Sequence, residues 1–221
     1  MLDLPLHSLH RPAAAQIAEP WLLVLMHGVG SNEQDLFGLA PYIPETFHVV
    51  SLRAPYRMGP NANAWFEFGV NPDGSRTIDE EQEIASRALV VQTVEALTRQ
   101  LNVPASRVIV GGFSQGGIMS LSVLLTKPEL VAGAMALHSR LLPEVLSQIA
   151  PASAFAGKQL WVSQGLQDNV IPVANGHFIV KQVEPLGLNL TYREFEGAHE
   201  IRPQELTTLV AWLQQLKPVS A

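Results

Sequence analysis

Short apolar runs recur along the chain and predict the strands of one sheet. Each run spans about five to seven residues and is mostly apolar, which is typical of strands that are buried on both faces of a parallel sheet. Strands are therefore predicted over residues 21–26, 48–52, 107–111, 131–137, 160–164 and 190–195.

Segments with a helical spacing of apolar residues lie between these runs. The clearest one begins near Asp79 and ends near Leu101, and the acidic residues in its first turn suit the positive end of the helix dipole. Pro203 suits the first turn of the last helix. Helices are predicted at about 34–40, 79–101, 115–126, 143–150, 173–186 and 203–216.

The alternation of strands and helices predicts the fold class. Strands joined by helical crossovers form right-handed βαβ units, so we expect a three-layer α/β sandwich with a mostly parallel twisted sheet and helices on both faces. No repeat, low-complexity tract or Ser/Gly-rich linker divides the chain. We therefore expect one domain over residues 1–221, in which residues 1–19 form an N-terminal extension or an edge strand.

Composition and charge narrow the classes of function. The chain contains no cysteine, which excludes disulfides, thiolate metal sites and a cysteine nucleophile. Its formal net charge of −6 argues against a nucleic-acid partner, which would favour a basic face. The first residues do not read as a signal peptide, and no apolar run approaches the roughly 20 residues that span a bilayer. We expect a cytoplasmic protein without a membrane span.

The segment from Gly112 to Gly116 reads Gly-Phe-Ser-Gln-Gly and matches the G-x-S-x-G pattern of a nucleophilic serine. The predicted strand before it and the predicted helix after it are the context that the pattern requires. Ser114 is therefore the candidate nucleophile. The alternative is a glycine-rich turn that packs closely or cradles a phosphate. A dinucleotide-binding fingerprint is a poor fit, because this segment lacks G-x-G-x-x-G.

A serine hydroxyl needs a base, and in this kind of fold the acid and then the histidine follow the serine along the chain. Asp168 is the only aspartate after Ser114 and follows a predicted strand, as does His199. All three residues are therefore expected at the carboxyl edge of the sheet, where ligands bind. The alternatives are an aspartate that stabilises a turn and a histidine that merely begins a helix. We assign His138 to the pocket wall or to a supporting position, because no aspartate lies between it and Ser114.

The negative oxygen of a tetrahedral intermediate needs hydrogen-bond donors that are already in place. The backbone N–H of Gln115, directly after the nucleophile, is one expected donor. The second is expected from the glycine-containing loop over residues 27–32, where we assign the N–H of Val29. His27 in this loop has no second ligand at a suitable spacing, so no metal site is predicted, and no cofactor.

These segments together resemble the phospholipase/carboxylesterase family of small α/β-hydrolases, which includes the acyl-protein thioesterases and many bacterial carboxylesterases. The resemblance implies an α/β-hydrolase fold without a large lid, with nucleophile, acid and base at Ser114, Asp168 and His199 and the oxyanion amides at Val29 and Gln115. It runs from about residue 20 to 216 and rests on the segments LMHGVGSNEQDL, LRAP, WFEF, GGFSQGGIMSL, SRLLPE, QGLQDNVIPV and EGAHEI.

The resemblance also implies that Trp65 lines the substrate pocket. The chain departs from the family in two places: it has His138-Ser139 where members often have Ser-Gly, and Ala198 where a glycine usually precedes the base. The first departure puts a bulkier, titratable group near the pocket. Further pocket residues are expected in loops beyond the strand ends, namely Met58, Val70, His138, Leu141, Leu142, Val170 and Ile171.

The expected function is that of a serine esterase that hydrolyses carboxylic esters with short to medium acyl chains through an acyl-enzyme. Acyl-protein thioesterase or lysophospholipase activity on longer acyl chains is the first alternative, because these substrates share the same reacting carbonyl. A non-catalytic binding module on a hydrolase scaffold is the second. The expected partner is a small-molecule ester or thioester. Exposed apolar loops near a lidless site are compatible with a homodimer.

Overall fold

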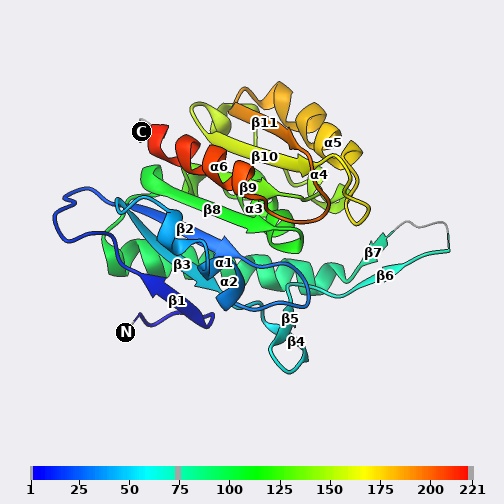
Figure 1. Ribbon diagram of the computed structural model, residues 1–221, viewed down its shortest axis with the longest axis horizontal. Coiled ribbons are helices and arrows are strands. Elements are labelled where there is room, and N and C mark those ends of the chain that lie inside the picture. Colours follow the sequence, from blue (N-terminus) through cyan, green and yellow to red (C-terminus); the bar gives the residue numbers. More distant parts are fainter. Residues whose placement is uncertain (1, 73–75, 219–221) are drawn as a thin grey trace.

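A central sheet organises the structure, a computed structural model that describes residues 2–72 and 76–218 (Figure 1). Its strands are β1 (Ser8–Arg11), β2 (Trp21–Met26), β3 (Phe47–Leu52), β8 (Val108–Phe113), β9 (Gly133–Leu137), β10 (Gln159–Gly165) and β11 (Asn189–Phe195). Their order is β1-β3-β2-β8-β9-β10-β11, and all neighbours are parallel except β1 and β3. The six strands predicted from apolar runs are confirmed, and the N-terminal segment contributes the edge strand β1.

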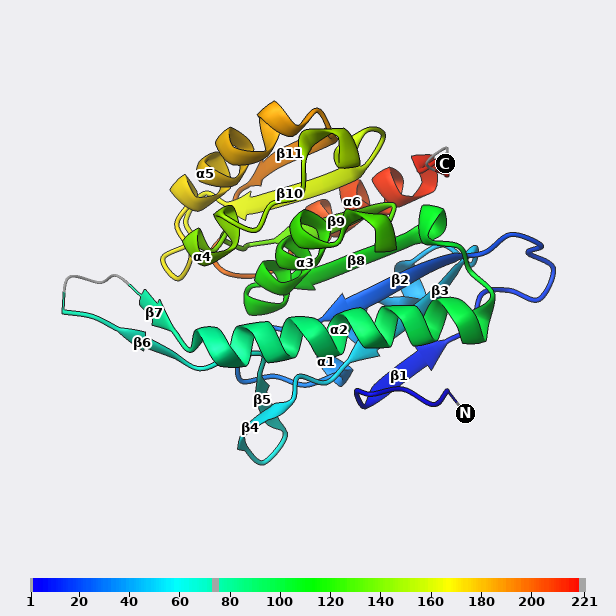
Figure 2. The ribbon, with the colours of Figure 1, turned by 180° about the vertical axis from the view of Figure 1, so that it is seen from behind.

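Alternating side chains of the buried strands face two separate cores. On β2, Leu22 and Val24 belong to one core, whereas Leu23 and Leu25 belong to the other. Burial on both faces explains why these strands are apolar along their whole length. Helices α2, α3 and α5 cover one face of the sheet, and α1 and α6 cover the other, which confirms the three-layer sandwich (Figures 1 and 2). The helices are α1 (Gln34–Phe37), α2 (Glu80–Leu101), α3 (Gln115–Thr126), α4 (Pro143–Leu146), α5 (Ala174–Val183) and α6 (Pro203–Gln215).

Capping residues account for where the longest helix begins and ends. The Asp79 carboxylate accepts a hydrogen bond from the Gln82 N–H at 3.0 Å, as an N-cap does. Asn102 adopts a left-handed conformation with φ 54°, which ends α2. The last helix begins at Pro203, as the sequence indicates.

Three other helices are shorter than predicted. Helix α1 ends before Gly38, and α4 covers only the first four residues of its predicted range. Helix α5 ends at Val183, because Pro185 cannot continue a helical hydrogen-bond ladder. Short 3-10 segments occur at Ala40–Tyr42, Ala105–Arg107, Pro128–Leu130, Ala152–Phe155 and Glu184–Leu186.

Two short hairpins between β3 and α2 are absent from the sequence prediction. One pairs β4 (Tyr56–Gly59) with β5 (Ala62–Ala64), and the other pairs β6 (Phe68–Val70) with β7 (Arg76–Ile78). Strands of three or four residues are too short to show a hydrophobic period. The hairpin of β6 and β7 projects from the end of the molecule at which α2 begins (Figure 2).

The helices also bear on the question of membrane insertion. Within residues 2–72 and 76–218, none of them combines the length and the apolar character needed to cross a bilayer.

Candidate active site

The turn between β8 and α3 presents Ser114 at the carboxyl edge of the sheet. Its backbone has φ 54° and ψ −116°, a strained conformation for a residue other than glycine. Strand and helix approach each other closely at this turn. A Cβ on Gly112 would collide with the Gly116 carbonyl group, and a Cβ on Gly116 would collide with the Met26 carbonyl oxygen. The G-x-S-x-G pattern is therefore a packing requirement of the turn.

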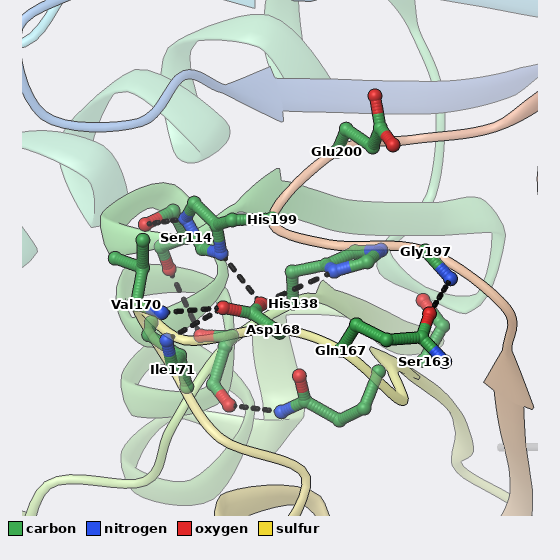
Figure 3. A network of polar contacts seen from close by, with 12 residues as sticks. Ser114, His138, Ser163, Gln167, Asp168, Val170, Ile171, Gly197, His199 and Glu200 are labelled. Atoms are coloured by element: carbon green, nitrogen blue, oxygen red, sulfur yellow. Dashed lines mark hydrogen bonds and ion pairs between the residues drawn. The ribbon is translucent and has the colours of Figure 1, made fainter.

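Three side chains from separate loops meet at this edge (Figure 3). His199 Nε2 lies 2.9 Å from Ser114 Oγ, and His199 Nδ1 lies 2.6 Å from Asp168 Oδ2. Asp168 follows β10 and His199 follows β11, and these two strands are neighbours in the sheet. When Nδ1–H donates to the carboxylate, Nε2 is free to accept the serine proton. The structure thus brings together the three residues that the sequence singled out.

The Asp168 carboxylate is buried and accepts hydrogen bonds at both oxygens. Its Oδ1 accepts from the N–H groups of Val170 and Ile171, each at 2.8 Å (Figure 3). Burial raises the pKa of Asp168, but the hydrogen bonds from His199, Ile171 and Val170 outweigh burial and hold the pKa below its ordinary value. The carboxylate therefore stays charged and orients the imidazole of His199.

A second imidazole lies on another side of Asp168. His138 Nδ1 is 3.4 Å from Asp168 Oδ2, and His138 Nε2 is 3.0 Å from Glu205 Oε2. Ser163 Oγ donates to the other oxygen of Glu205 at 2.6 Å. Burial lowers the pKa of His138, but its contacts with Glu205 and Asp168 outweigh burial and raise the pKa above its ordinary value. A protonated His138 can donate to both carboxylates at once.

This placement decides between the two positions predicted for His138. Its side chain is only 1% exposed and faces carboxylates, so the prediction that it lines the pocket is wrong. Its contacts show that it holds the Asp168 carboxylate in place from within the protein.

His138, Asp168 and His199 also have the spacing of a metal site, since one polar atom of each lies within 4.8 Å of the others. Hydrogen bonds account for these atoms without an ion. His199 Nε2 faces Ser114, and His138 Nε2 faces Glu205. The donor set therefore suits proton transfer and charge pairing better than an open metal site.

The loop after β2 lies against Ser114. A Cβ on Gly28 would come within 3.4 Å of Ser114 Cβ. Val29 and Gln115 both line the pocket that contains Ser114, and among the described residues neither of their N–H groups donates to a protein acceptor. Two free backbone donors beside a serine hydroxyl can stabilise a negative oxygen.

Buried polar contacts hold this loop in place. His27 Nδ1 donates to Gly28 O at 2.7 Å, and His27 Nε2 accepts from the Ala54 N–H at 3.1 Å. Burial lowers the pKa of His27, which agrees with a neutral ring that donates through one nitrogen and accepts through the other. The Trp65 indole N–H donates to His27 O at 2.9 Å. The Trp65 side chain is fully buried, so the prediction that it lines the pocket is wrong; it braces the loop instead.

The Gln115 side chain ties the start of α3 to the segment after β5. Its Oε1 accepts from the Trp65 N–H at 2.8 Å, and its Nε2 donates to Phe66 O at 2.6 Å. These backbone groups are buried, so the Gln115 amide satisfies polar atoms that would otherwise lack partners. Gln115 therefore also positions Phe66, which lines the pocket.

A small pocket of about 60 Å³ opens beside Ser114. This volume is equivalent to a few water molecules and suits a short acyl group. Of the predicted wall residues, Val170 and Ile171 line it. Other residues line it that the sequence analysis did not single out, namely Phe66, Phe68, Arg76, Ile118 and Arg140.

The remaining predicted wall residues lie elsewhere. Leu141 and Leu142 are buried, because their side chains turn into the core that α2, α3 and α5 cover. Met58 is exposed on the β4–β5 hairpin, and Val70 lines a neighbouring hollow instead. Arg140 occupies the place expected of Leu141, one residue earlier in the same loop. A charged residue at the carboxyl edge, directly before two apolar ones, was the signal that could have found it.

The chain is similar in sequence to known hydrolases. Residues 13–217 match the family model described as Phospholipase/Carboxylesterase. Acyl-protein thioesterase 1 from Mycosarcoma maydis is 31% identical over 220 residues, which cover 89% of this chain and 91% of that protein.

Solved structures show the same fold. The crystal structure of esterase PE8 has a TM-score of 0.80 and 25% identity, covering 95% of this chain and 98% of that one. A carboxylesterase from Mesorhizobium loti has a TM-score of 0.82 and 21% identity, covering 98% of each chain. Both solved structures superimpose on nearly the whole of this chain, which has the α/β-hydrolase fold. The described residues form no large lid. With a family match over nearly its whole length, the chain belongs to the phospholipase/carboxylesterase family and is a hydrolase of the carboxylesterase and acyl-protein thioesterase type.

Proposed function

We propose that the protein is a serine esterase that hydrolyses carboxylic esters with short to medium acyl chains. The observation that carries this proposal is the chain of contacts from Ser114 through His199 to Asp168, at 2.9 and 2.6 Å, beside two backbone donors that have no acceptor within the described part of the chain. Membership of the phospholipase/carboxylesterase family supports the reaction class.

In the first half of the reaction, Ser114 Oγ attacks the carbonyl carbon while its proton passes to His199 Nε2. The carbonyl oxygen becomes negative and accepts hydrogen bonds from the N–H groups of Val29 and Gln115. Protonated His199 then gives the proton to the leaving alcohol oxygen as the carbon–oxygen bond breaks. The acyl group is left on Ser114, and Asp168 stabilises the imidazolium while it exists.

In the second half, a water molecule takes the place of the alcohol. His199 accepts a proton from the water while the water oxygen attacks the acyl carbon. The bond to Ser114 Oγ then breaks, and His199 returns the proton to this oxygen. One ester and one water give one acid and one alcohol, and every side chain returns to its first state.

Similarity to the acyl-protein thioesterase 1 of Mycosarcoma maydis favours thioester hydrolysis as a second candidate function. The same steps apply with sulfur as the leaving atom. The pocket of about 60 Å³ favours short acyl groups. A panel of oxygen esters and thioesters from acetyl to palmitoyl separates the candidates, because an esterase of the proposed kind loses kcat/KM as the chain lengthens, whereas a long-chain thioesterase gains it.

Replacement of the nucleophile tests the proposed function directly. Ser114→Ala is expected to lower kcat on 4-nitrophenyl acetate or butyrate by about 10⁴-fold or more, because no other group can form the acyl-enzyme. Labelling by a fluorophosphonate probe should disappear with it, while the melting temperature stays close to that of the wild type.

Ser153→Ala, at an exposed position, is the matched control and should keep full activity. A Ser114→Ala variant that retained most of the wild-type rate would remove this residue from the mechanism. A wild-type protein that neither hydrolyses the ester panel nor reacts with the probe would instead be a binding module.

A further inference from the structure

Two arginines lie beside Ser114 and have no part in the mechanism proposed above. Arg76 lies on β7 and Arg140 in the loop after β9, and both line the pocket that contains Ser114. Both also line a neighbouring hollow of about 360 Å³, together with Val170 and Ile171. The two spaces share these walls and therefore adjoin, so a substrate held at Ser114 lies next to both arginines.

The positive charge of Arg140 is poorly compensated by the protein. Its Nε is buried without a hydrogen-bond partner among the described residues. Burial and the nearby charge of Arg76 lower the pKa of Arg140, and Glu144 opposes this effect only in part. Within the described part of the chain, no carboxylate lies close enough to Arg140 to form an ion pair. A bound negative group would therefore relieve an existing electrostatic cost.

Among the described residues, the contacts of Arg76 leave its charge available. Its Nη2 donates to Val170 O at 2.9 Å, and its guanidinium carbon lies 5.3 Å from the centre of the Phe68 ring. Both contacts fix its position, but neither supplies a negative charge. The hollow beyond adds the side-chain amides of Asn169 and Asn175, and no acidic residue is among its described walls.

Acidic side chains line a separate hollow next to His199. His199, Asp35 and Glu200 are among its walls, and Glu200, which pairs with Arg202 at 2.8 Å, points away from Ser114 (Figure 3). His199 must protonate the leaving oxygen, so the leaving alcohol lies next to this acidic hollow. The acyl part then extends the other way, toward the two arginines.

From this arrangement we infer that Arg76 and Arg140 form a subsite for a carboxylate or phosphate group at the far end of the substrate's acyl part. The inference rests on the proposed esterase function and names its substrate class, which is half-esters of dicarboxylic acids and related anionic acyl esters. A planar guanidinium donates two parallel N–H groups to such an anion. Val170 and Ile171 offer apolar contact for the carbon chain between the anion and the reacting carbonyl.

Matched pairs of esters test the subsite. Mono(4-nitrophenyl) glutarate carries an anion on its acyl side, and its methyl ester is the neutral partner. 4-Acetoxybenzoate and its methyl ester place the same difference on the alcohol side. Ser114→Ala gives the background rate for each ester, including attack of the glutarate carboxylate on its own ester. For the wild type we expect kcat/KM to be at least about tenfold higher for the anionic glutarate than for its methyl ester, with no such preference between the acetoxybenzoates.

Arginine variants assign the preference to the subsite. Arg140→Gln should reduce the ratio of the two glutarate kcat/KM values by about tenfold, and Arg76→Gln should act in the same direction. Arg140→Lys keeps the charge without the planar fork and should restore part of the ratio. Arg99→Gln removes the same charge from the exposed end of α2 and should leave the ratio unchanged.

Equal rates for the two glutarates in the wild type, or a preference only on the alcohol side, would overturn the subsite and leave the esterase function standing. If no ester is hydrolysed, the proposed function fails, and calorimetric titration with glutarate and with inorganic phosphate decides the subsite. Binding of either anion that Arg140→Gln abolishes supports it and shows which anion it takes. Absence of binding to the wild type overturns it.

Discussion

Asp168 contacts the imidazoles of His138 and His199, and the surroundings of these two rings give them different roles. His199 is 17% exposed and faces Ser114, whereas His138 is buried and faces Glu205. The centres of the His138 and His199 rings lie 6.0 Å apart, and the ring planes are at 85° to each other. Two buried carboxylates with one imidazole between them need a positive charge for balance. At the scale of single residues, His138 thus keeps the Asp168 carboxylate paired on the side away from Ser114.

His138→Gln tests this charge pairing. The raised pKa of His138 means that its protonated form stabilises the fold fully below the ordinary value of 6.5, and this contribution is lost as pH rises through the folded-state pKa. The free energy of unfolding of the variant should therefore be about 3 kcal/mol lower than that of the wild type at about pH 6. This difference should shrink toward about pH 9. Urea unfolding at both pH values measures the difference.

The control for this prediction is His177→Gln, an exposed histidine that lies 2.7 Å from Glu194. Its effect on unfolding should be small at both pH values, because exposed ion pairs contribute little. If His138→Gln lowers the free energy of unfolding equally at both pH values, His138 supports the fold without carrying charge.

The three side chains that meet at the carboxyl edge could be found in the sequence because each has a local signature. Ser114 lies between glycines that the turn requires, and Asp168 is the only aspartate after it. Glu205 has no such signature, and the only local signal for Arg140 is its charge at the carboxyl edge before two apolar residues. Their roles depend on how α6 and the loop after β9 pack against the sheet, and that packing is a property of the folded chain.

At the scale of elements, the loop after β2, the turn at the nucleophile and the segment after β5 form one connected unit. Ser31 and Asn63 form a bridge between the loop and β5, and the Gly30 N–H donates to Asn63 O at 2.8 Å. Gln115 joins α3 to the same segment through Trp65 and Phe66. The free backbone donors therefore rest on buried hydrogen bonds from three elements.

Gln115→Ala tests this connection while keeping the backbone N–H. Removing the side-chain amide leaves the Trp65 N–H and the Phe66 carbonyl buried without partners, so the free energy of unfolding should fall by about 2 kcal/mol. The acylation rate constant should fall too, since the loop is less firmly placed. Chemical denaturation and single-turnover kinetics measure the two effects, and Gln92→Ala on the exposed face of α2 is the control. Wild-type stability in Gln115→Ala would contradict the bracing role.

The larger elements could be predicted because burial leaves a clear pattern in the sequence. The strands of the sheet are apolar on both faces, and the start of α2 is marked by Asp79 and the acidic residues that follow it. The hairpins could not be predicted in this way, because β4 and β6 are short and mostly exposed. Phe68 and Arg76 lie on one of these hairpins, so part of the pocket wall was missed with it.

At the scale of the whole molecule, α6 completes both the core and the polar network. Leu209 and Leu213 are buried against the sheet, and Glu205 on the same helix faces His138. Burial of each leucine stabilises the fold by about 2 kcal/mol. The total stability of a domain is only about 5–15 kcal/mol, so the loss of the helix would remove a large part of it.

A chain that ends at Arg202 is therefore expected to lack a cooperative thermal transition and to give no fluorophosphonate labelling, although it contains Ser114, Asp168 and His199. A chain that ends at Leu216 keeps all of α6 and is the control. Circular dichroism and probe labelling measure both chains. Labelling of the shorter chain at the rate of the longer one would show that α6 is dispensable.

The position of Glu205 and His199 along the chain has a consequence for protein synthesis. A ribosome adds the strand that carries Ser114 long before it adds these two residues, and domains form from the N-terminal side as they emerge. A nascent polypeptide can therefore fold the turn that carries Ser114 while His199 is still missing. Under the proposed mechanism, hydrolysis begins only after translation has passed α6, so the unfinished chain is expected to leave esters intact.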